Sequence, residues 1–303
     1  MKASIMFGLL LVFIISAILV VAKPDMVPAT NDKAGVSVMI PAHAVQVADN
    51  VFSLGQAQDL DGRVVEGFMF IDKKKAPAKP GTVCGNNICE PGETKSCPGD
   101  CAGGGGTGSS TCFAVIANGA KWKATEPYIT GFGIDPAVTE TSLNTWDSEV
   151  AFDVFGAGDV NGTTDGADDV SPDGKNEVEF VNLGEGNTIA VTTVWGIFRG
   201  PPGGRELVEW DAEFNTAYSF GDADTSPGIV MDYQNIATHE FGHALGLAHP
   251  DDSCTEETMY RFADFNETKK RTLESGDVAG VNNVLNPVRV ATAYPQTCSP
   301  KLL

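Results

Sequence analysis

The sequence predicts an α+β fold, because strand-like runs and helix-like segments alternate in its C-terminal two thirds. The strand-like runs are rich in β-branched and aromatic residues, and they span residues 150–155, 177–183, 188–198 and 206–214. One helix-like segment precedes these runs, and a second one follows them. The second segment carries three of the four histidines of the chain.

The first helix is predicted from its start signal and its apolar spacing. Asp135 is expected to cap the helix, and Pro136 suits its first turn. Apolar residues then recur at near-helical spacing, which gives the helix one face to pack on a sheet: Val138, Leu143, Trp146 and Val150. Residues 112–117 are predicted as a first strand or the approach to it.

The chain of 303 residues is strongly acidic, with a formal net charge of −20. A surface of this sign repels phosphates, so the charge argues against nucleic-acid binding. The hydrophobic fraction of 42% is normal for a globular protein with a sizeable core.

An apolar run over residues 3–22 follows Lys2 and ends in the small residue Ala22. This pattern is typical of a secretory signal peptide, residues 1–22, and the seven cysteines agree with export to an oxidising space. The run is also long enough to span a bilayer, so an uncleaved N-terminal anchor stays open. The protein is therefore expected to be secreted or, if the segment stays attached, membrane-anchored with its body outside the cytoplasm.

Several smaller segments precede residue 112. Residues 23–75 are predicted as a small β region with a strand over residues 63–72, and both a propeptide and an accessory domain stay open. Residues 76–83 are predicted as a stiff, charged linker and residues 102–111 as a glycine-rich one. Between them, residues 84–101 form a cysteine-rich module, for which two disulfides suit an exported chain better than a four-thiolate zinc site: Cys84, Cys89, Cys97 and Cys101.

The histidine-rich segment, residues 239–249, has the pattern H-E-x-x-H-x-x-G-x-x-H. On a helix, His239 and His243 share one face and can bind one zinc ion. Gly246 can adopt a positive φ, which ends the helix and returns His249 to the same ion. Glu240 is then placed to take a proton from water beside the ion without binding it. Histidines that only cap or pack the helix are the alternative.

This long pattern is similar to the signature of the metzincin metallopeptidases. The resemblance implies a zincin-like catalytic domain with a twisted mixed sheet and three helices, one catalytic zinc ion, and protein or peptide substrates. It also implies that Met259 is the methionine of a Met-turn beneath the zinc ligands, with an ordinary core methionine as the alternative. Tyr260, directly after it, is expected to line the substrate pocket.

Two further segments resemble matrixins in particular. Residues 273–285 are similar to the last matrixin helix, L-x-x-D-D-I-x-G-I-x-x-L-Y, with Asp277 at the second aspartate and Gly276 in place of the first. Residues 209–215 are similar to the segment before the zinc helix. There the resemblance implies structural roles for two residues, Asp211 and Asn215.

The matrixin resemblance covers roughly residues 112–287, within a predicted catalytic domain of residues 112–303. Matrixins are often kept latent by a propeptide cysteine in the pattern P-R-C-G-x-P-D. Cys84 is followed by glycine but preceded by Thr-Val, so no cysteine switch is expected. For the dispersed cysteines, pairing of Cys298 with either Cys254 or Cys112 is considered, and either choice leaves one thiol unpaired.

The loop between the first two strand-like runs is glycine-bearing and acidic. Oxygen ligands on such a loop suit calcium, although the spacing is not that of an EF-hand. A calcium site and a solvated acidic loop both stay open for its aspartates: Asp159, Asp165, Asp168, Asp169 and Asp173. The second, structural zinc of matrixins is not expected, because the extra histidines that hold it are absent from the sequence.

The most specific hypothesis is therefore a secreted zinc-dependent endopeptidase. It would hydrolyse peptide bonds by metal-activated water, with Glu240 as the general base. A cell-surface binding or adhesion protein with a structural zinc is the alternative. The two differ in whether cleavage of a protein such as casein depends on the metal.

Overall fold

The computed structural model describes residues 26–28, 39–75 and 111–285. The predicted leader, the 76–83 linker and the cysteine-rich module lie outside these ranges. Within them, no helix combines the length and the apolar character needed to cross a bilayer.

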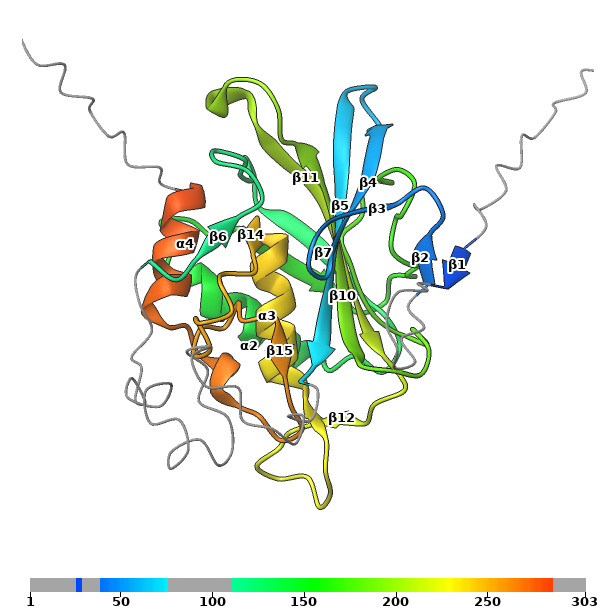
Figure 1. Ribbon diagram of the computed structural model, residues 1–303, viewed down its shortest axis with the longest axis vertical. Helices are drawn as coiled ribbons and strands as arrows, with labels where there is room; N and C mark the ends of the chain where they lie inside the picture. The colour runs from blue at the N-terminus through cyan, green and yellow to red at the C-terminus, as the bar shows by residue number, and fades with distance from the viewer. Residues whose placement is uncertain (1–25, 29–38, 76–110, 286–303) are drawn as a thin grey trace, which may run out of the picture.

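A mixed sheet of nine strands forms the centre of the molecule (Figure 1). The pairs from β3 to β11 are antiparallel, and those from β11 to β8 are parallel. A short strand, β15 (Phe262–Ala263), pairs parallel with the end of β5. The strand order is β3 (Val45–Ala48), β4 (Val51–Gln58), β5 (Val64–Lys74), β10 (Thr188–Ile197), β11 (Glu206–Asn215), β9 (Glu177–Val181), β7 (Glu126–Thr130) and β8 (Phe155–Asp159).

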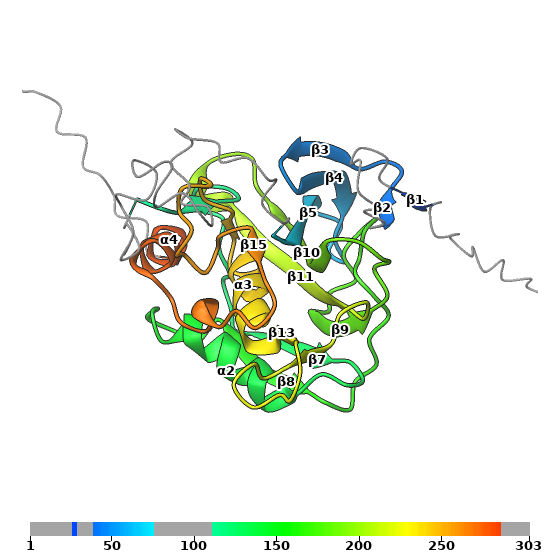
Figure 2. The ribbon, with the colours of Figure 1, turned by 60° about the horizontal axis from the view of Figure 1, so that its bottom comes forward.

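Three α-helices occur in the described residues, as expected, and they lie on one side of the sheet (Figures 1 and 2). They are α2 (Pro136–Asp147), α3 (Tyr233–Ala244) and α4 (Ser275–Leu285). Helix α3 packs on β10 and β11, and α2 packs on α3. Helix α4 packs on the two-stranded pair of β6 (Ala114–Val115) and β14 (Leu247–Ala248). The α+β class with a mixed sheet and three helices is therefore confirmed.

The remaining elements are short. Strand β1 (Met26–Pro28) pairs with β2 (Met39–Pro41), and β12 (Phe220–Gly221) pairs with β13 (Met231–Asp232), which leads directly into α3. Two 3₁₀ turns span Pro202–Gly204 and Lys269–Arg271.

The start of α2 follows the predicted capping. Asp135 has an extended backbone, and its carboxylate accepts the N–H groups of Ala137 and Val138. Pro136 occupies the first turn, where a missing N–H costs nothing. The buried face of α2 includes Leu143 and Trp146, and the indole N–H of Trp146 donates to the carbonyl of Thr238 on α3 at 2.7 Å. Helix α2 thereby braces the helix that carries the histidines.

Strands β5 and β10 are buried on both faces, and each face packs into a different core. On the side of the helices, Phe70 and Val194 belong to the larger core together with residues of α2 and α3. On the other side, Met69, Ile71 and Val191 belong to a smaller core closed by β4. Because side chains alternate along a strand, Asp72 points to the same side as Phe70. It therefore faces α3.

The predicted strand over residues 150–155 is wrong. Helix α2 ends at Asp147, whose carboxylate accepts the N–H groups of Val154 and Phe155 and holds this segment as a loop. The strand that follows, β8, begins at Phe155. Strand β7 was not predicted. In the 112–117 segment only Ala114 and Val115 form a strand.

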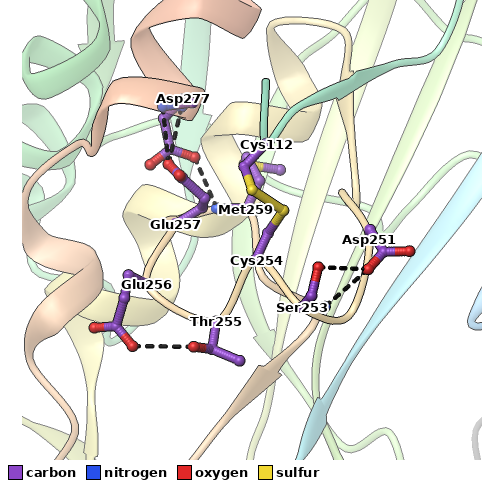
Figure 3. Close-up of a disulfide and its surroundings, with 10 residues drawn as sticks. Cys112, Asp251, Ser253, Cys254, Thr255, Glu256, Glu257, Met259 and Asp277 are labelled. Carbon is purple, nitrogen blue, oxygen red and sulfur yellow. Dashed lines mark hydrogen bonds between the residues drawn. A yellow bond between two sulfur atoms is a disulfide. The ribbon is translucent and has the colours of Figure 1, made fainter. Parts of the chain in front are cut away.

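A disulfide joins Cys112 to Cys254, as Figure 3 shows. The pairings of Cys298 with either of these residues are therefore wrong, and Cys298 itself lies outside the described residues. The bond ties the start of the catalytic segment to the loop between β14 and the predicted Met-turn. Gly276 packs against this junction, because a Cβ there would lie 2.4 Å from the carbonyl oxygen of Cys112. This close approach explains glycine at the position where matrixins have an aspartate.

Candidate metal centre and active site

Helix α3 positions the first two histidines. It begins after Asp232, whose carboxylate accepts the N–H of Asn235. Ile236 and other apolar residues bury the helix in the larger core. His239 and His243 are one turn apart and fully buried. These two histidine side chains are therefore positioned by a buried helix rather than by a surface loop.

Gly246 turns the chain, as predicted. Its φ is +95°, a conformation that residues with a side chain rarely adopt. The turn leads through β14 to His249, which comes back to the face of α3 that carries the other two histidines. The local sequence thus determines a compact cluster of three imidazoles.

The three imidazoles converge through their Nε2 atoms. His249 Nε2 lies 3.3 Å from His239 Nε2 and 3.1 Å from His243 Nε2. The outer nitrogens of the two helix histidines face carbonyl groups. His239 Nδ1 lies 2.6 Å from the oxygen of Thr258, and His243 Nδ1 lies 2.9 Å from that of Leu247.

These contacts determine the tautomers of the two helix histidines. A carbonyl only accepts, so each Nδ1 must carry the proton, and each Nε2 presents a lone pair. Burial lowers the pKa of His243 to about 3 and holds the pKa values of His239 and His249 well below their usual range. Neutral imidazoles with converging nitrogens, two of them oriented by a carbonyl, have the donor set of a metal site. The residues present therefore fit a zinc ion, for which His239, His243 and His249 would be the ligands.

Glu240 lies beside this cluster and is fully buried. Its Oε2 accepts a hydrogen bond of 2.5 Å from the hydroxyl of Thr192 on β10, while its Oε1 has no partner among the described residues. Burial raises the pKa of Glu240 well above the usual range, and the nearby carboxylate of Asp72 adds to the shift. One carboxylate oxygen is thus held in place and the other is available to receive a proton.

Met259 lies beneath the helix between the histidines, and it is 2% exposed. A Cβ at Gly242 would lie 2.2 Å from its sulfur, so the methionine packs directly on α3. The carboxylate of Asp277 holds the turn by accepting the N–H of Thr258 at 2.7 Å and that of Met259 at 3.1 Å (Figure 3). The turn in turn places the Thr258 carbonyl that orients His239.

This geometry can be compared with known proteins. Residues 185–285 match the family model of the matrixins, and this stretch contains β10, β11, α3, the Met259 turn and α4. Human neutrophil collagenase is 30% identical over 97 residues, which are 30% of this chain and 20% of that protein. The chain carries a matrixin-like catalytic domain.

The aligned part of the chain spans only about a fifth of the length of the collagenase it matches. Even so, the matrixin-like domain supports a metallopeptidase function, and matrixins hold a zinc ion of the kind that the three histidines of this chain could bind. Matrixins are generally extracellular proteins that act on peptides or proteins, which agrees with the expected substrates and location.

Tyr260 lies in the matrixin-like domain next to the Met-turn but is only 5% exposed. Its ring packs against that of Phe262 with 5.6 Å between the ring centroids, and burial raises the pKa of Tyr260 to about 12. A pocket of about 480 Å³ next to the cluster is lined by His249, Phe70 and Arg261 but not by Tyr260. A pocket-lining role for Tyr260 stays a prediction.

The aspartates predicted as calcium ligands do not form one cluster. Asp168 and Asp173 come together with Glu209 of β11, and oxygens of the three lie within 4.8 Å of one another. Asp173 also contacts the amine of Lys175, which lies 2.9 Å from Asp165 as well.

The other two predicted calcium ligands lie apart from this group. The carboxylate of Asp159 accepts the N–H of Asn161 at 2.8 Å, and the backbone carbonyl of Asp169 accepts a hydrogen bond of 3.1 Å from His43. Asp211 holds the acidic loop by accepting the N–H groups of Asp168 and Glu177.

Four residues near these sites escaped the sequence analysis: Asp72, Thr192, Glu209 and Lys270. Thr192 on β10 contacts Glu240 on α3. Lys270 is fully buried, and its amine donates to the carbonyl of Tyr260 and lies 3.4 Å from His239 Nδ1. None of them belongs to a local pattern with the histidines. Asp72 is the most distant in sequence, and its carboxylate oxygen lies 3.9 Å from His239 Nε2.

Proposed function

We propose that this chain is a secreted zinc-dependent endopeptidase that hydrolyses peptide bonds with Glu240 as its general base. The observation that carries the proposal is the convergence of three neutral imidazole nitrogens beside a buried carboxylate with one unpartnered oxygen. A purely structural metal site does not need such a carboxylate, because a structural zinc has four ligands and no open position.

A zinc ion bound by the histidines would supply Lewis acidity, which polarises a peptide carbonyl and makes water more acidic. The chain supplies the proton transfers. Glu240 Oε1 would take the proton from the attacking water and later deliver it to the leaving amine. Thr192 holds the other oxygen, which leaves Oε1 without a partner among the described residues.

The substrate is proposed to be an extended peptide that pairs with β10, near Val191. Main-chain pairing to a strand binds peptides with little regard to their sequence, and pockets beside the strand then select side chains. In this structure that edge of β10 is already paired with β5, in which Ile71 lies opposite Val191. A peptide can therefore reach this position only when β5 leaves it.

Calcium binding by the acidic loop is a further part of the proposal, with a changed set of ligands. Asp168 and Asp173 remain candidates, and Glu209 joins them with a buried Oε1 that has no partner among the described residues. Glu177, close by, also has an unpartnered buried oxygen, Oε1. A hard cation with oxygen ligands suits such a group of carboxylates.

The experiment that tests the function compares the wild-type chain with Glu240→Gln. Glutamine keeps the shape of the side chain but cannot take up the proton, so zinc content should persist while cleavage of labelled casein falls by at least about a hundredfold. Metal analysis and the fluorescence of released peptides measure the two quantities. Both proteins are assayed before and after brief trypsin treatment, because Lys75 and Lys79 lie between β5 and the catalytic domain.

Glu149→Gln is the matched control, because Glu149 is exposed after α2 and far from the histidines in the sequence. It should keep both the zinc and the cleavage rate of the wild type. Cleavage by Glu240→Gln at the wild-type rate would refute the mechanism. Absence of chelator-sensitive cleavage from every form, including the trypsin-treated one, would favour the binding or adhesion protein instead.

A further inference from the structure

We propose that Asp72 of β5 is a fourth ligand of the ion held by His239, His243 and His249. With Asp72 bound, β5 occupies the substrate position and keeps the enzyme latent. This inference rests on the proposed peptidase function for its second half only. The metal contact stands on the structure of the site.

The first observation is the position of β5 in the sheet. It pairs antiparallel with β10 from Glu66 to Lys73, along the edge proposed for the substrate. At its C-terminal end, Lys73 and Lys74 pair with β15 on the other side, directly after the Met-turn. Strand β5 thus bridges two segments of the catalytic domain, β10 and β15, with backbone pairing to both.

The second observation is what β5 presents to the cluster. Phe70 and Asp72 point to the side of α3, and the ring of Phe70 stacks on His243 with 4.2 Å between the ring centroids. The same ring meets His249 edge-on at 6.1 Å. Asp72 comes one alternation further along the strand and lies over His239. Both side chains fill space that a bound peptide would need.

The third observation is the chemistry of the Asp72 carboxylate, which is fully buried. Oδ1 accepts the N–H of Lys73 at 3.0 Å and lies 3.9 Å from His239 Nε2, while Oδ2 has no partner among the described residues. His239 Nε2 presents a lone pair, since its Nδ1 proton is used on Thr258. An ionised carboxylate and a nitrogen lone pair that face each other in a dry site repel unless a cation lies between them.

Asp72, His239 and Glu240 each offer an atom within 4.8 Å of the others. The carboxylate therefore lies on the side of the cluster where Glu240 would meet water and the peptide carbonyl. An ion bound by Asp72 there has lost the position that catalysis needs. The device differs from the cysteine switch of matrixins, since the residue is a carboxylate and it comes from a strand of the central sheet.

Charged contacts hold β5 and its neighbours in place. Glu66 Oε1 lies 2.5 Å from Arg199, just beyond the end of β10. Arg261, directly after the Met-turn, lies 3.0 Å from Asp49 in the turn between β3 and β4 and also pairs with Asp252. The strand therefore leaves the cleft only when these contacts and two rows of backbone hydrogen bonds break.

The test measures zinc affinity in the full chain, by competition with a chromogenic chelator, for the wild type, Asp72→Asn and Asp72→Ala. Loss of the ligand should weaken zinc binding by about tenfold or more, most in the alanine variant. Glu66→Gln is the matched control, because it also neutralises a buried carboxylate of β5 but lies at the far end of the strand. The variant keeps the backbone pairing of residue 66 with Gly196, and it weakens only a contact with the exposed Arg199, which contributes little to holding the strand. It should bind zinc as the wild type does. Equal affinity in all four proteins would overturn the assignment.

Cobalt-substituted protein gives a second readout that does not depend on activity. The visible absorption of bound Co²⁺ reports its ligands, so the spectrum should change in Asp72→Ala and stay the same in Glu66→Gln. An unchanged spectrum in both variants would also overturn the assignment. This measurement answers the case in which Asp72→Ala unfolds the strand, since Asp72→Asn keeps the size of the side chain and should change the spectrum too.

Latency is tested with casein at saturating zinc, which separates loss of inhibition from loss of metal. Asp72→Ala should cleave at least about tenfold faster than the wild type, because the strand has lost its bond to the ion. Unchanged cleavage in this variant, with measurable cleavage by the trypsin-treated wild type, would overturn latency. Failure of every form to cleave would refute the proposed function and leave the metal result to decide the role of Asp72.

Discussion

At Gly242, between the two ligand histidines of α3, the helix has no room for a methyl group. A Cβ there would lie 2.2 Å from the sulfur of Met259 and 2.7 Å from Cζ2 of Trp146. Both neighbours are buried in the larger core, so neither is free to retreat. Gly242 thus allows Met259 and Trp146 to pack directly against the helix backbone between the two histidines.

Gly242→Ala should therefore lower the free energy of unfolding by about 1–3 kcal/mol, as overpacking of a core does. Urea denaturation followed by tryptophan fluorescence measures the change. Gly203→Ala is the control, since nothing lies within 4 Å of a Cβ at Gly203 and it should stay within about 0.5 kcal/mol of the wild type. A stabilised Gly242→Ala protein, as expected for an exposed helix position, would contradict the packing argument.

The residue scale also shows which parts of the site the sequence can predict. His239, His243, Glu240 and Gly246 lie in one helix and its turn, so their spacing alone predicts how they meet. The tautomer of His239 depends on the carbonyl of Thr258, 19 residues further along the chain. Its position follows from how a separate turn packs, which no local spacing encodes.

At the scale of elements, α4 and the Met-turn form one unit. Asp277, near the start of α4, accepts three backbone N–H groups with its two oxygens, those of Thr258, Met259 and Glu274. Glu257 of the turn in return accepts the N–H groups of Gly276 and Asp277. The helix and the turn therefore satisfy each other's backbone donors. The turn in this way fixes the Thr258 carbonyl, which orients His239.

Asp277→Asn should disturb this unit, because the amide offers one accepting oxygen where the carboxylate offers two. The unpaired N–H groups should lower the free energy of unfolding by about 1–3 kcal/mol. Zinc affinity should fall by about tenfold, since the Thr258 carbonyl orients His239. Chelator competition and urea denaturation measure the two effects.

Asn282→Ala is the control on the same helix, because among the residues that the structure describes the Asn282 side chain bonds within α4, to the carbonyl of Val278. It should leave zinc affinity unchanged. An Asp277→Asn protein with the zinc affinity of the wild type would show that the turn keeps its position without the carboxylate.

Elements differed in how well the sequence predicted them. Strands β10 and β11 are long and rich in β-branched or aromatic residues, so their pattern is strong. Strand β7 has the sequence EPYIT with a proline inside it, and β8 has the sequence FGAGD with two glycines. Both residue types weaken the strand pattern, and tertiary pairing overrides it, since β7 pairs with β9 and β8 pairs with β7.

At the scale of the whole molecule, the least predictable feature is that β5 joins the catalytic sheet. The sequence predicts a strand over residues 63–72. Its partner, β10, lies more than a hundred residues further along the chain, and no local pattern shows which distant strand will pair with it. The long gap between β5 and β10 is closed by pairing and burial. As a result, the proposed fourth ligand, Asp72, lies outside the site that the sequence predicts.

Several of the acidic residues also lie close together in the folded chain. On β9, β11 and the loop between β8 and β9, burial raises the pKa of Glu209 to about 9, of Glu177 to about 7 and of Asp168 to about 6. Burial holds the pKa of Asp211 well above its usual range as well. These carboxyl groups keep their protons to a higher pH in the folded chain than in the unfolded one. The folded state therefore gains stability from them at low pH only.

Without calcium, the contribution of these carboxylates to the free energy of unfolding should fall as pH rises from about 4 to about 9. The stabilising contribution is fully present below the unfolded pKa values, near 4, and is lost as pH passes the raised folded values. Calcium replaces the protons, so its stabilising effect should be small at acid pH and grow as the carboxylates ionise. Thermal melts across this range, with zinc held constant and with either calcium or magnesium added, measure both trends.

Glu209→Gln separates this cluster from the general charge of the chain. The variant removes the group whose pKa is raised to about 9, so its melting temperature should depend less on pH than that of the wild type and gain little from calcium. General repulsion among acidic residues would instead leave the two proteins with parallel pH profiles. If calcium raises the melting temperature equally in both proteins, the ion binds elsewhere. If calcium does not change the melting temperature of the wild type, the acidic loop binds no calcium and is held by its own hydrogen bonds and protonated carboxyl groups.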